Sequence, residues 1–182
     1  MRNRLLLSVV TIAALSACAS QSPMMATYSQ ANLPDAVKVP SGHSVVMETT
    51  TTAGEITYQC RAKQAMADQF EWVFVGPAAG LKDRKGAMVG KYYGPPATWE
   101  SRDGSKITGT QVAVAPNGEG NIPNQLVKAN PAMGAGAMQG VSYIQRVATV
   151  GGTAPKAACV KANENEKQVV QYLADYIFYK AI

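Results

Sequence analysis

The sequence predicts a single mainly β domain, folded as an antiparallel β-sandwich or a small barrel of about nine or ten short strands. From about Val37 onward, short runs rich in β-branched and aromatic residues are separated by glycine and proline, which is typical of all-β domains. No segment shows a compelling helical period over an ordinary helix length, and no stretch of the sequence repeats.

The first 17 residues have the order of an export signal, because two arginines precede an apolar run that ends in small residues. The run is shorter than the roughly 20 residues that a membrane-spanning helix needs. The segment Leu15-Ser16-Ala17-Cys18 resembles a bacterial lipobox, which implies removal of residues 1–17 and acylation of Cys18. Ordinary secretion is the alternative, since Ala17-Cys18-Ala19 also fits the A-x-A cleavage pattern.

The remaining chain divides into two parts. Residues 18–36 are small and polar without an apolar period, and they predict a flexible tether between the lipid and the domain. Residues 37–182 form the β domain. Residues 18–182 are long enough for one domain with a proper core.

Strand patterns follow one another through the first half of the domain. The predicted strands cover residues 45–52, residues 56–62, a segment with Phe70, Trp72 and Phe74, residues 88–93 and residues 98–100. Ala53-Gly54-Glu55 predicts a hairpin turn between the first two strands, and Gly76-Pro77 predicts the end of the third. Alternation along the second strand places Cys60 on the core face.

In the second half, the predicted strands cover residues 106–114, 122–129, 141–150 and 169–179. Residues 130–140 are too rich in glycine and proline for regular structure and predict a loop. The last segment fits both a helix, with apolar residues four apart, and an alternating strand. Its aromatic and β-branched content favours the strand.

Charge and cysteine content narrow the function classes. The chain has 17 basic and 12 acidic residues, for a net charge of +5; loss of the two arginines in residues 1–17 leaves 15 against 12, or +3. No basic run is interleaved with aromatic residues, so nucleic acid is not expected as a partner.

With Cys18 assigned to lipid, Cys60 and Cys159 remain in an oxidising compartment, where we expect a disulfide. Two separate buried thiols are the alternative.

Several short motifs occur in order along the domain. They are Tyr58-Gln59-Cys60, Trp72-Val73-Phe74, Gly76-Pro77, Tyr93-Gly94-Pro95 with Trp99, Asp103-Gly104-Ser105-Lys106, Tyr143-Ile144-Gln145-Arg146-Val147, Ala154-Pro155, Cys159, and Ala174-Asp175-Tyr176-Ile177-Phe178-Tyr179. Together they resemble the exported domain-of-unknown-function 3455 family, over roughly Val39 to Tyr179. The resemblance implies one exported domain and pairing of Cys60 with Cys159, and almost nothing about activity.

Few residues point to catalysis. His43 is the only histidine, and we expect it to be an exposed structural residue. No metal site and no cofactor are predicted, because a lone histidine cannot make a multi-histidine site and the glycine-rich segments miss the spacing of nucleotide-binding loops. A hydrolase that used His43 with Asp103 or Asp175 is the residual case, and no G-x-S-x-G motif marks its nucleophile.

Aromatic residues and one arginine form the best candidate for a binding site. Tyr92, Tyr93 and Trp99 flank a proline-stiffened loop, and Arg146 lies in a strand beside apolar neighbours. Stacking aromatics and an orienting cation suit a sugar, a peptide or an amphipathic small molecule. The alternative is a core tryptophan, with an arginine that is satisfied by an aspartate or a carbonyl.

These patterns predict a bacterial envelope protein that is held by its lipid. Ala19, not an aspartate, follows Cys18, and the resemblance to enteric-type lipoproteins implies sorting to the outer membrane, where the domain would face the periplasm or the cell surface. Its partners would be the membrane and a small-molecule, glycan or envelope-protein ligand, or it would support the envelope. Enzymatic activity is not favoured. The alternatives are a secreted-type hydrolase with a site built from dispersed loop residues, a purely structural or assembly lipoprotein, and a soluble protein of the periplasm.

The lipidation hypothesis gives the first testable prediction. Cells supplied with labelled fatty acid should incorporate the label into the intact protein, and Cys18→Ser should abolish it, because the lipid is attached to the thiol of Cys18. In a membrane fractionation, the variant should also appear in a different fraction from the native protein. Unchanged label and fractionation would contradict lipidation at Cys18.

Overall fold

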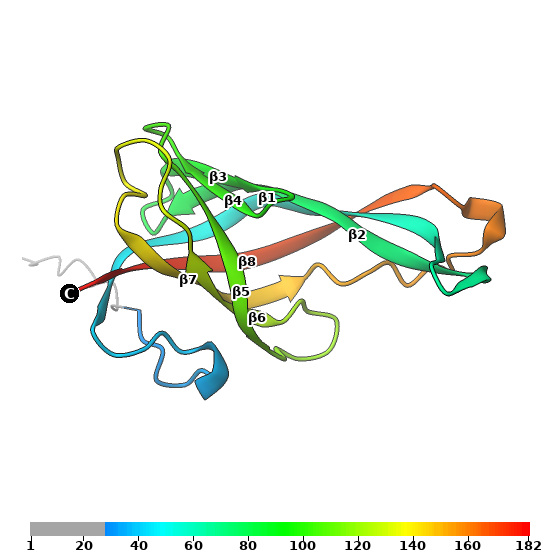
Figure 1. Cartoon of the computed structure of the whole chain (residues 1–182), viewed down its shortest axis with the longest axis horizontal. Coiled ribbons are helices and arrows are strands. Elements are labelled where there is room, and N and C mark those ends of the chain that lie inside the picture. The colour runs from blue at the N-terminus through cyan, green and yellow to red at the C-terminus, as the bar shows by residue number, and fades with distance from the viewer. Residues whose placement is uncertain (1–27) are drawn as a thin grey trace, which may run out of the picture.

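The computed structural model describes residues 28–182, whose strands form one closed antiparallel barrel (Figure 1). The strands are β1 (His43–Lys63), β2 (Met66–Asp83), β3 (Met88–Tyr93), β4 (Thr98–Ser101), β5 (Lys106–Ala115), β6 (Asn124–Ala129), β7 (Val141–Gly151) and β8 (Lys167–Ala181), with two short 3-10 helices, η1 (Asp35–Val37) and η2 (Lys161–Asn163). Each strand pairs with the next, and β8 pairs with β1. The mainly β antiparallel fold is confirmed, and of the two predicted forms the chain adopts the barrel.

The predicted hairpin at Ala53-Gly54-Glu55 is wrong, because β1 runs straight through this segment and both halves pair with β2. Two residues, Ala53 and Gly54, stand opposite a single residue of β2, which is the arrangement of a β-bulge. Ala53 has a φ of 46°, and a Cβ on Gly54 would lie 2.4 Å from the carbonyl oxygen of Tyr172. The backbone conformation that the sequence suggested for a hairpin turn therefore occurs in a β-bulge within a continuous strand.

The prediction that Gly76-Pro77 ends a strand is also wrong, because β2 continues to Asp83. The register slips by one residue here, as Gly76 lies opposite Thr57 and Phe74 lies opposite Tyr58. These two irregularities join segments that the sequence separates, and the described chain accordingly has eight strands, of which β1 and β2 are the longest. The predicted loop over residues 130–140 and the predicted strand over residues 169–179 are confirmed.

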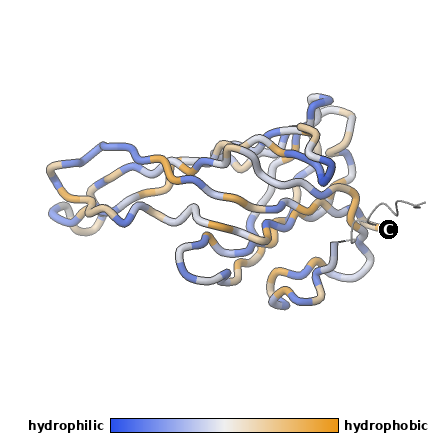
Figure 2. The backbone as a smooth tube through the Cα atoms, turned by 180° about the vertical axis from the view of Figure 1, so that it is seen from behind, coloured by the Kyte–Doolittle hydropathy of each residue, from blue (hydrophilic) through white to orange (hydrophobic). Residues whose placement is uncertain are grey.

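The barrel wall is apolar on both faces where β6, β7 and β8 lie side by side. Its inner face contributes buried side chains such as Ile144 and Phe178 to the barrel core. Its outer face is covered by the segment that precedes β1, where Val37 packs with Leu126 and Ile177. Figure 2 shows the resulting mixture of hydrophobic and hydrophilic positions along the strands. Burial on both faces explains why residues 176–179 of β8 are apolar or aromatic at four successive positions.

A buried glutamine holds the N-terminal segment on the barrel. Gln145 of β7 is fully buried; it accepts hydrogen bonds from the hydroxyls of Tyr28 and Tyr179 and donates to the carbonyl of Val37 and to Gln30. Residues 28–36, the last part of the predicted tether, thus lie against the barrel. The signal segment, Cys18 and the first part of the tether fall outside the described residues.

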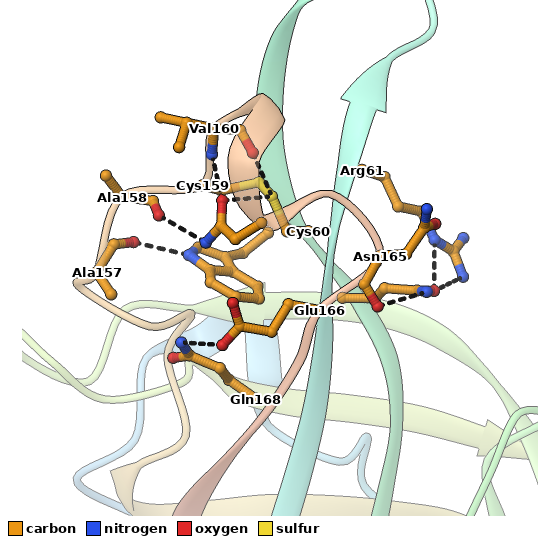
Figure 3. Close-up of a disulfide and its surroundings, with 12 residues drawn as sticks. Cys60, Arg61, Ala157, Ala158, Cys159, Val160, Asn165, Glu166 and Gln168 are labelled. Atoms are coloured by element: carbon orange, nitrogen blue, oxygen red, sulfur yellow. Dashed lines mark hydrogen bonds between the residues drawn. A yellow bond between two sulfur atoms is a disulfide. The ribbon is translucent and has the colours of Figure 1, made fainter.

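Beyond the barrel, β1, β2 and β8 extend into an arm with the loop that precedes β8 (Figure 1). The disulfide between Cys60 and Cys159 joins β1 to this loop, with 5.5 Å between the Cα atoms, and the disulfide prediction is confirmed (Figure 3). The indole of Trp72 donates a hydrogen bond of 2.7 Å to the carbonyl of Ala157 in the same loop. In the described part of the chain, no helix has the length and apolar character required to cross a membrane.

The second prediction concerns this disulfide. Replacing Cys60 and Cys159 by alanine together should lower the free energy of unfolding by about 3–5 kcal/mol, because the bond closes a loop of 99 residues in the unfolded chain. Urea unfolding of the purified protein measures this change. The wild-type protein in reductant is the matched control and should show the same loss. Equal stability of the oxidised, reduced and doubly substituted proteins would contradict a stabilising role for the bond.

Candidate ligand-binding site

The barrel wall has an opening beside β4. Residues 98–100 of β4 pair with residues 106–108 of β5, and beyond that point β5 pairs only with β6. A cavity of about 340 Å³ lies at this opening. Its described lining comes from six strands and the turn before β4, namely Phe74, Tyr92, Ala97, Trp99, Gly109, Gln111, Gln125, Val127 and Arg146. This volume falls at the small end of the range of about 300–1,000 Å³ that is common for ligand pockets.

One wall of the cavity is aromatic. Tyr92 of β3 and Trp99 of β4 are directly opposite each other in the sheet, and their rings stack with centroids 4.8 Å apart. Tyr176 of β8 meets the edge of Trp99 at 5.6 Å. Trp99 is 1% exposed, yet its Nε1 has no hydrogen-bond partner among residues 28–182. A buried N–H group without a partner costs free energy.

The opposite wall carries the charge. Arg146 of β7 donates from Nε and Nη2 to the carbonyl oxygen of Pro123, at 3.2 and 3.0 Å. Within residues 28–182, no carboxylate forms an ion pair with it. Among the described residues that line the cavity, Arg146 has the only charged side chain.

Tyrosine hydroxyls near Arg146 are neutral at physiological pH. Burial raises the pKa of Tyr172 to about 12 and raises the pKa of Tyr176 well above its usual value. Burial also raises the pKa of Tyr92, while the positive charge of Arg146 acts in the opposite direction on all three. The phenols therefore donate hydrogen bonds without cancelling the charge of the guanidinium.

Polar and apolar groups alternate around the opening. The side chain of Gln125 donates to that of Gln111 over 2.6 Å, which joins β6 and β5 across the cavity wall. Phe74 of β2 is 52% exposed and packs edge-on against Tyr58. Gly109 is required for the shape of the wall, because a Cβ there would lie 2.4 Å from Val127 Cγ1.

A family model described as a protein of unknown function, DUF3455, matches residues 40–180 of the chain. The chain belongs to this family. No curated protein and no solved structure matches it. The matched region covers the barrel strands and all the described residues that line the cavity, so the cavity lies within the DUF3455 domain.

Three of the four residues that the sequence proposes for a ligand site lie together in this DUF3455 barrel, namely Tyr92, Trp99 and Arg146. Tyr93 does not join them, because successive residues of a strand point to opposite faces. Its hydroxyl donates to Glu100 over 2.9 Å on the outer face. The carbonyl partner expected for a structural arginine is present as Pro123, and it occupies two of the five N–H donors of Arg146.

Sequence reasoning missed Phe74, Gly109, Gln111 and Gln125. Alternation places Gln111 on the same face of β5 as Gly109, and Gln125 on the same face of β6 as Val127, and this much can be deduced from the sequence. The sequence does not show the register between β5 and β6, or which face of each strand points into the barrel.

The residual hydrolase set is not assembled in the described structure. Nδ1 of His43 lies 3.1 Å from the carbonyl oxygen of Pro40, and its ring packs edge-on against Tyr143. Asp103 accepts hydrogen bonds from Ser105 and from the backbone of Ala137, which lower its pKa to about 2. Asp175 accepts a hydrogen bond from Thr50. Residues 28–182 contain no group of three or more histidine, cysteine, aspartate or glutamate side chains that would hold a metal ion.

The third prediction separates structural from binding roles in β7. Arg146→Gln should lower the free energy of unfolding by about 1 kcal/mol, because it removes bonds to one carbonyl of a half-buried side chain. Its neighbour supplies the matched control, since Gln145→Leu leaves several buried partners unpaired and should cost about 3 kcal/mol. Urea unfolding measures both. An equal or larger loss for Arg146→Gln would show that Arg146 is chiefly structural.

Proposed function

We propose that this DUF3455 protein is a lipid-anchored binding protein of the bacterial envelope, and that it holds a small amphipathic molecule in the barrel cavity. The observation that carries the proposal is the unequal pairing of the cavity's polar groups. Gln145, on the outer side of β7, has its hydrogen bonds filled by the protein. Arg146, on the cavity side, retains unused donors.

Apolar surface in the cavity supports the same proposal. The stacked rings of Tyr92 and Trp99, together with Phe74 at the opening, offer an aromatic surface to a bound molecule. Burying about 200 Å² of apolar ligand surface against such a wall contributes roughly 5 kcal/mol. Donors from Arg146 would fix the orientation of a molecule that has both apolar and polar parts.

The proposed anchor places the barrel near a membrane. Described contacts with the barrel begin at Tyr28, which donates to Gln145. Tyr28 follows Cys18 by ten positions, and a chain of that length spans at most about 35 Å. An acylated Cys18 would therefore keep the cavity within a short distance of the lipid surface, where amphipathic molecules are concentrated.

The fourth prediction tests binding with Trp99 as the reporter. In the chain carrying Cys18→Ser and Trp72→Phe, Trp99 is the only tryptophan. Titration with N-phenyl-1-naphthylamine should quench the emission of Trp99 to saturation at one probe per chain, since the probe would lie close enough for energy transfer. Near-ultraviolet circular dichroism checks that the variant is folded.

Two exposed apolar residues provide a matched pair of controls. Phe74 lines the cavity and is 52% exposed, while Val150 lies outside it and is 57% exposed. Phe74→Arg should weaken probe binding at least fivefold, whereas Val150→Arg should leave it unchanged. Absence of saturable quenching in the folded protein would overturn the proposal and favour a purely structural role.

A further inference from the structure

Building on the proposed function, we infer that the bound molecule is a single-chain or single-ring carboxylate, whose head group binds Arg146 and whose apolar body lies along Tyr92 and Trp99. The described lining of the cavity has a net positive charge. Arg146 is the only charged side chain among the described lining residues, and the two glutamines there are neutral. The cavity therefore has an unbalanced positive charge, which favours an anion over a neutral or cationic molecule.

The free edge of the guanidinium specifies the kind of anion. Nε and Nη2 share the carbonyl oxygen of Pro123, which occupies one edge of the planar group. Arginine has five N–H donors, so the edge formed by Nη1 and Nη2 remains available for two parallel hydrogen bonds. Such a fork matches the two oxygens of a carboxylate. A phosphate monoester would bring a charge of about −1.5 to −2 against a single cation, and the match would be poorer.

Cavity size limits the apolar part. A volume of about 340 Å³ holds one short chain or one ring system, and it excludes a lipid with two long acyl chains. The aromatic side chains that line the cavity, Tyr92, Trp99 and Phe74, are available to pack against that part.

Burial sets the orientation of the ligand. Arg146 lies on the same face of β7 as the fully buried Ile144 and opposite the buried Tyr176 of β8, so it belongs to the inner part of the barrel. Phe74 and Gln111 are exposed and mark the outer end of the cavity. The carboxylate therefore enters first, and the apolar end remains toward Phe74.

Competition between matched ligands tests the inference. In the chain carrying Cys18→Ser, decanoate, 1-decanol, decylamine and decyl phosphate are compared, below their aggregation limits, by displacement of N-phenyl-1-naphthylamine. Decanoate should bind at least tenfold more tightly than the other three. Arg146→Gln should weaken decanoate binding about tenfold to fiftyfold and leave decanol binding unchanged, because a charge-assisted pair of hydrogen bonds is lost.

Control variants distinguish a failure of the carboxylate assignment from a failure of the proposed function. Arg61→Gln removes the same charge from an exposed position on the arm and should leave decanoate binding unchanged. Arg146→Lys should recover part of the preference for decanoate, since it restores the charge without the fork. If decanol equals decanoate, if decyl phosphate binds more tightly, or if Arg146→Gln keeps the preference, the carboxylate assignment is wrong while binding in the cavity stands. If neither the probe nor any of the four compounds binds, the proposed function itself is wrong.

Discussion

The pairing of β1 with β8 is the constraint on which the rest of the structure depends. These strands lie at opposite ends of the domain sequence, and their pairing converts a row of antiparallel strands into a closed barrel. Closure leaves the inner and outer faces in different surroundings, so a one-residue change of register would exchange core and surface. The bulge at Ala53 and Gly54 keeps both halves of β1 paired with β2 and β8 as the strand passes from barrel to arm.

Adjacent residues of β7 show what this constraint does to polar side chains. Gln145 points outward and is buried beneath the N-terminal segment, where tyrosine hydroxyls and a carbonyl complete its hydrogen bonds. Arg146 points inward, to a cavity that offers it one carbonyl. Arg146, which is half-buried, keeps N–H donors that the protein does not use. The difference between these neighbours is the physical basis for the proposal that the inner face binds a ligand.

Local sequence patterns predicted most strands, yet they could not show how distant segments pair. The positive φ of Ala53 is compatible with a tight turn and with a bulge, and only the pairing of the flanking segments with β2 distinguishes them. Tyr92 and Tyr93 are equivalent in sequence, and the barrel makes one a cavity residue and the other an outer one. Arg146 was recognisable as a charge among apolar neighbours. Gln111 and Gln125 were not, since their meeting depends on the register of β5 against β6.

The opening in the barrel wall arises where the neighbouring edges of β5 and β2 have no strand between them. Beyond residue 108, β5 has no strand on its β4 side in the described chain, and β2 before residue 78 has none on its β3 side. Unpaired strand edges invite association with other chains, and proteins usually limit them with short strands and bulges. Here β5 carries a bulge between Gln111 and Ala113, and β2 shifts register near Gly76. Continued pairing of β4 with β5 would close the wall where Gly109 and Gln111 line the cavity, and Arg146 would lose its access to solvent. The short β4 is thus the structural feature that keeps the inward-facing charge reachable.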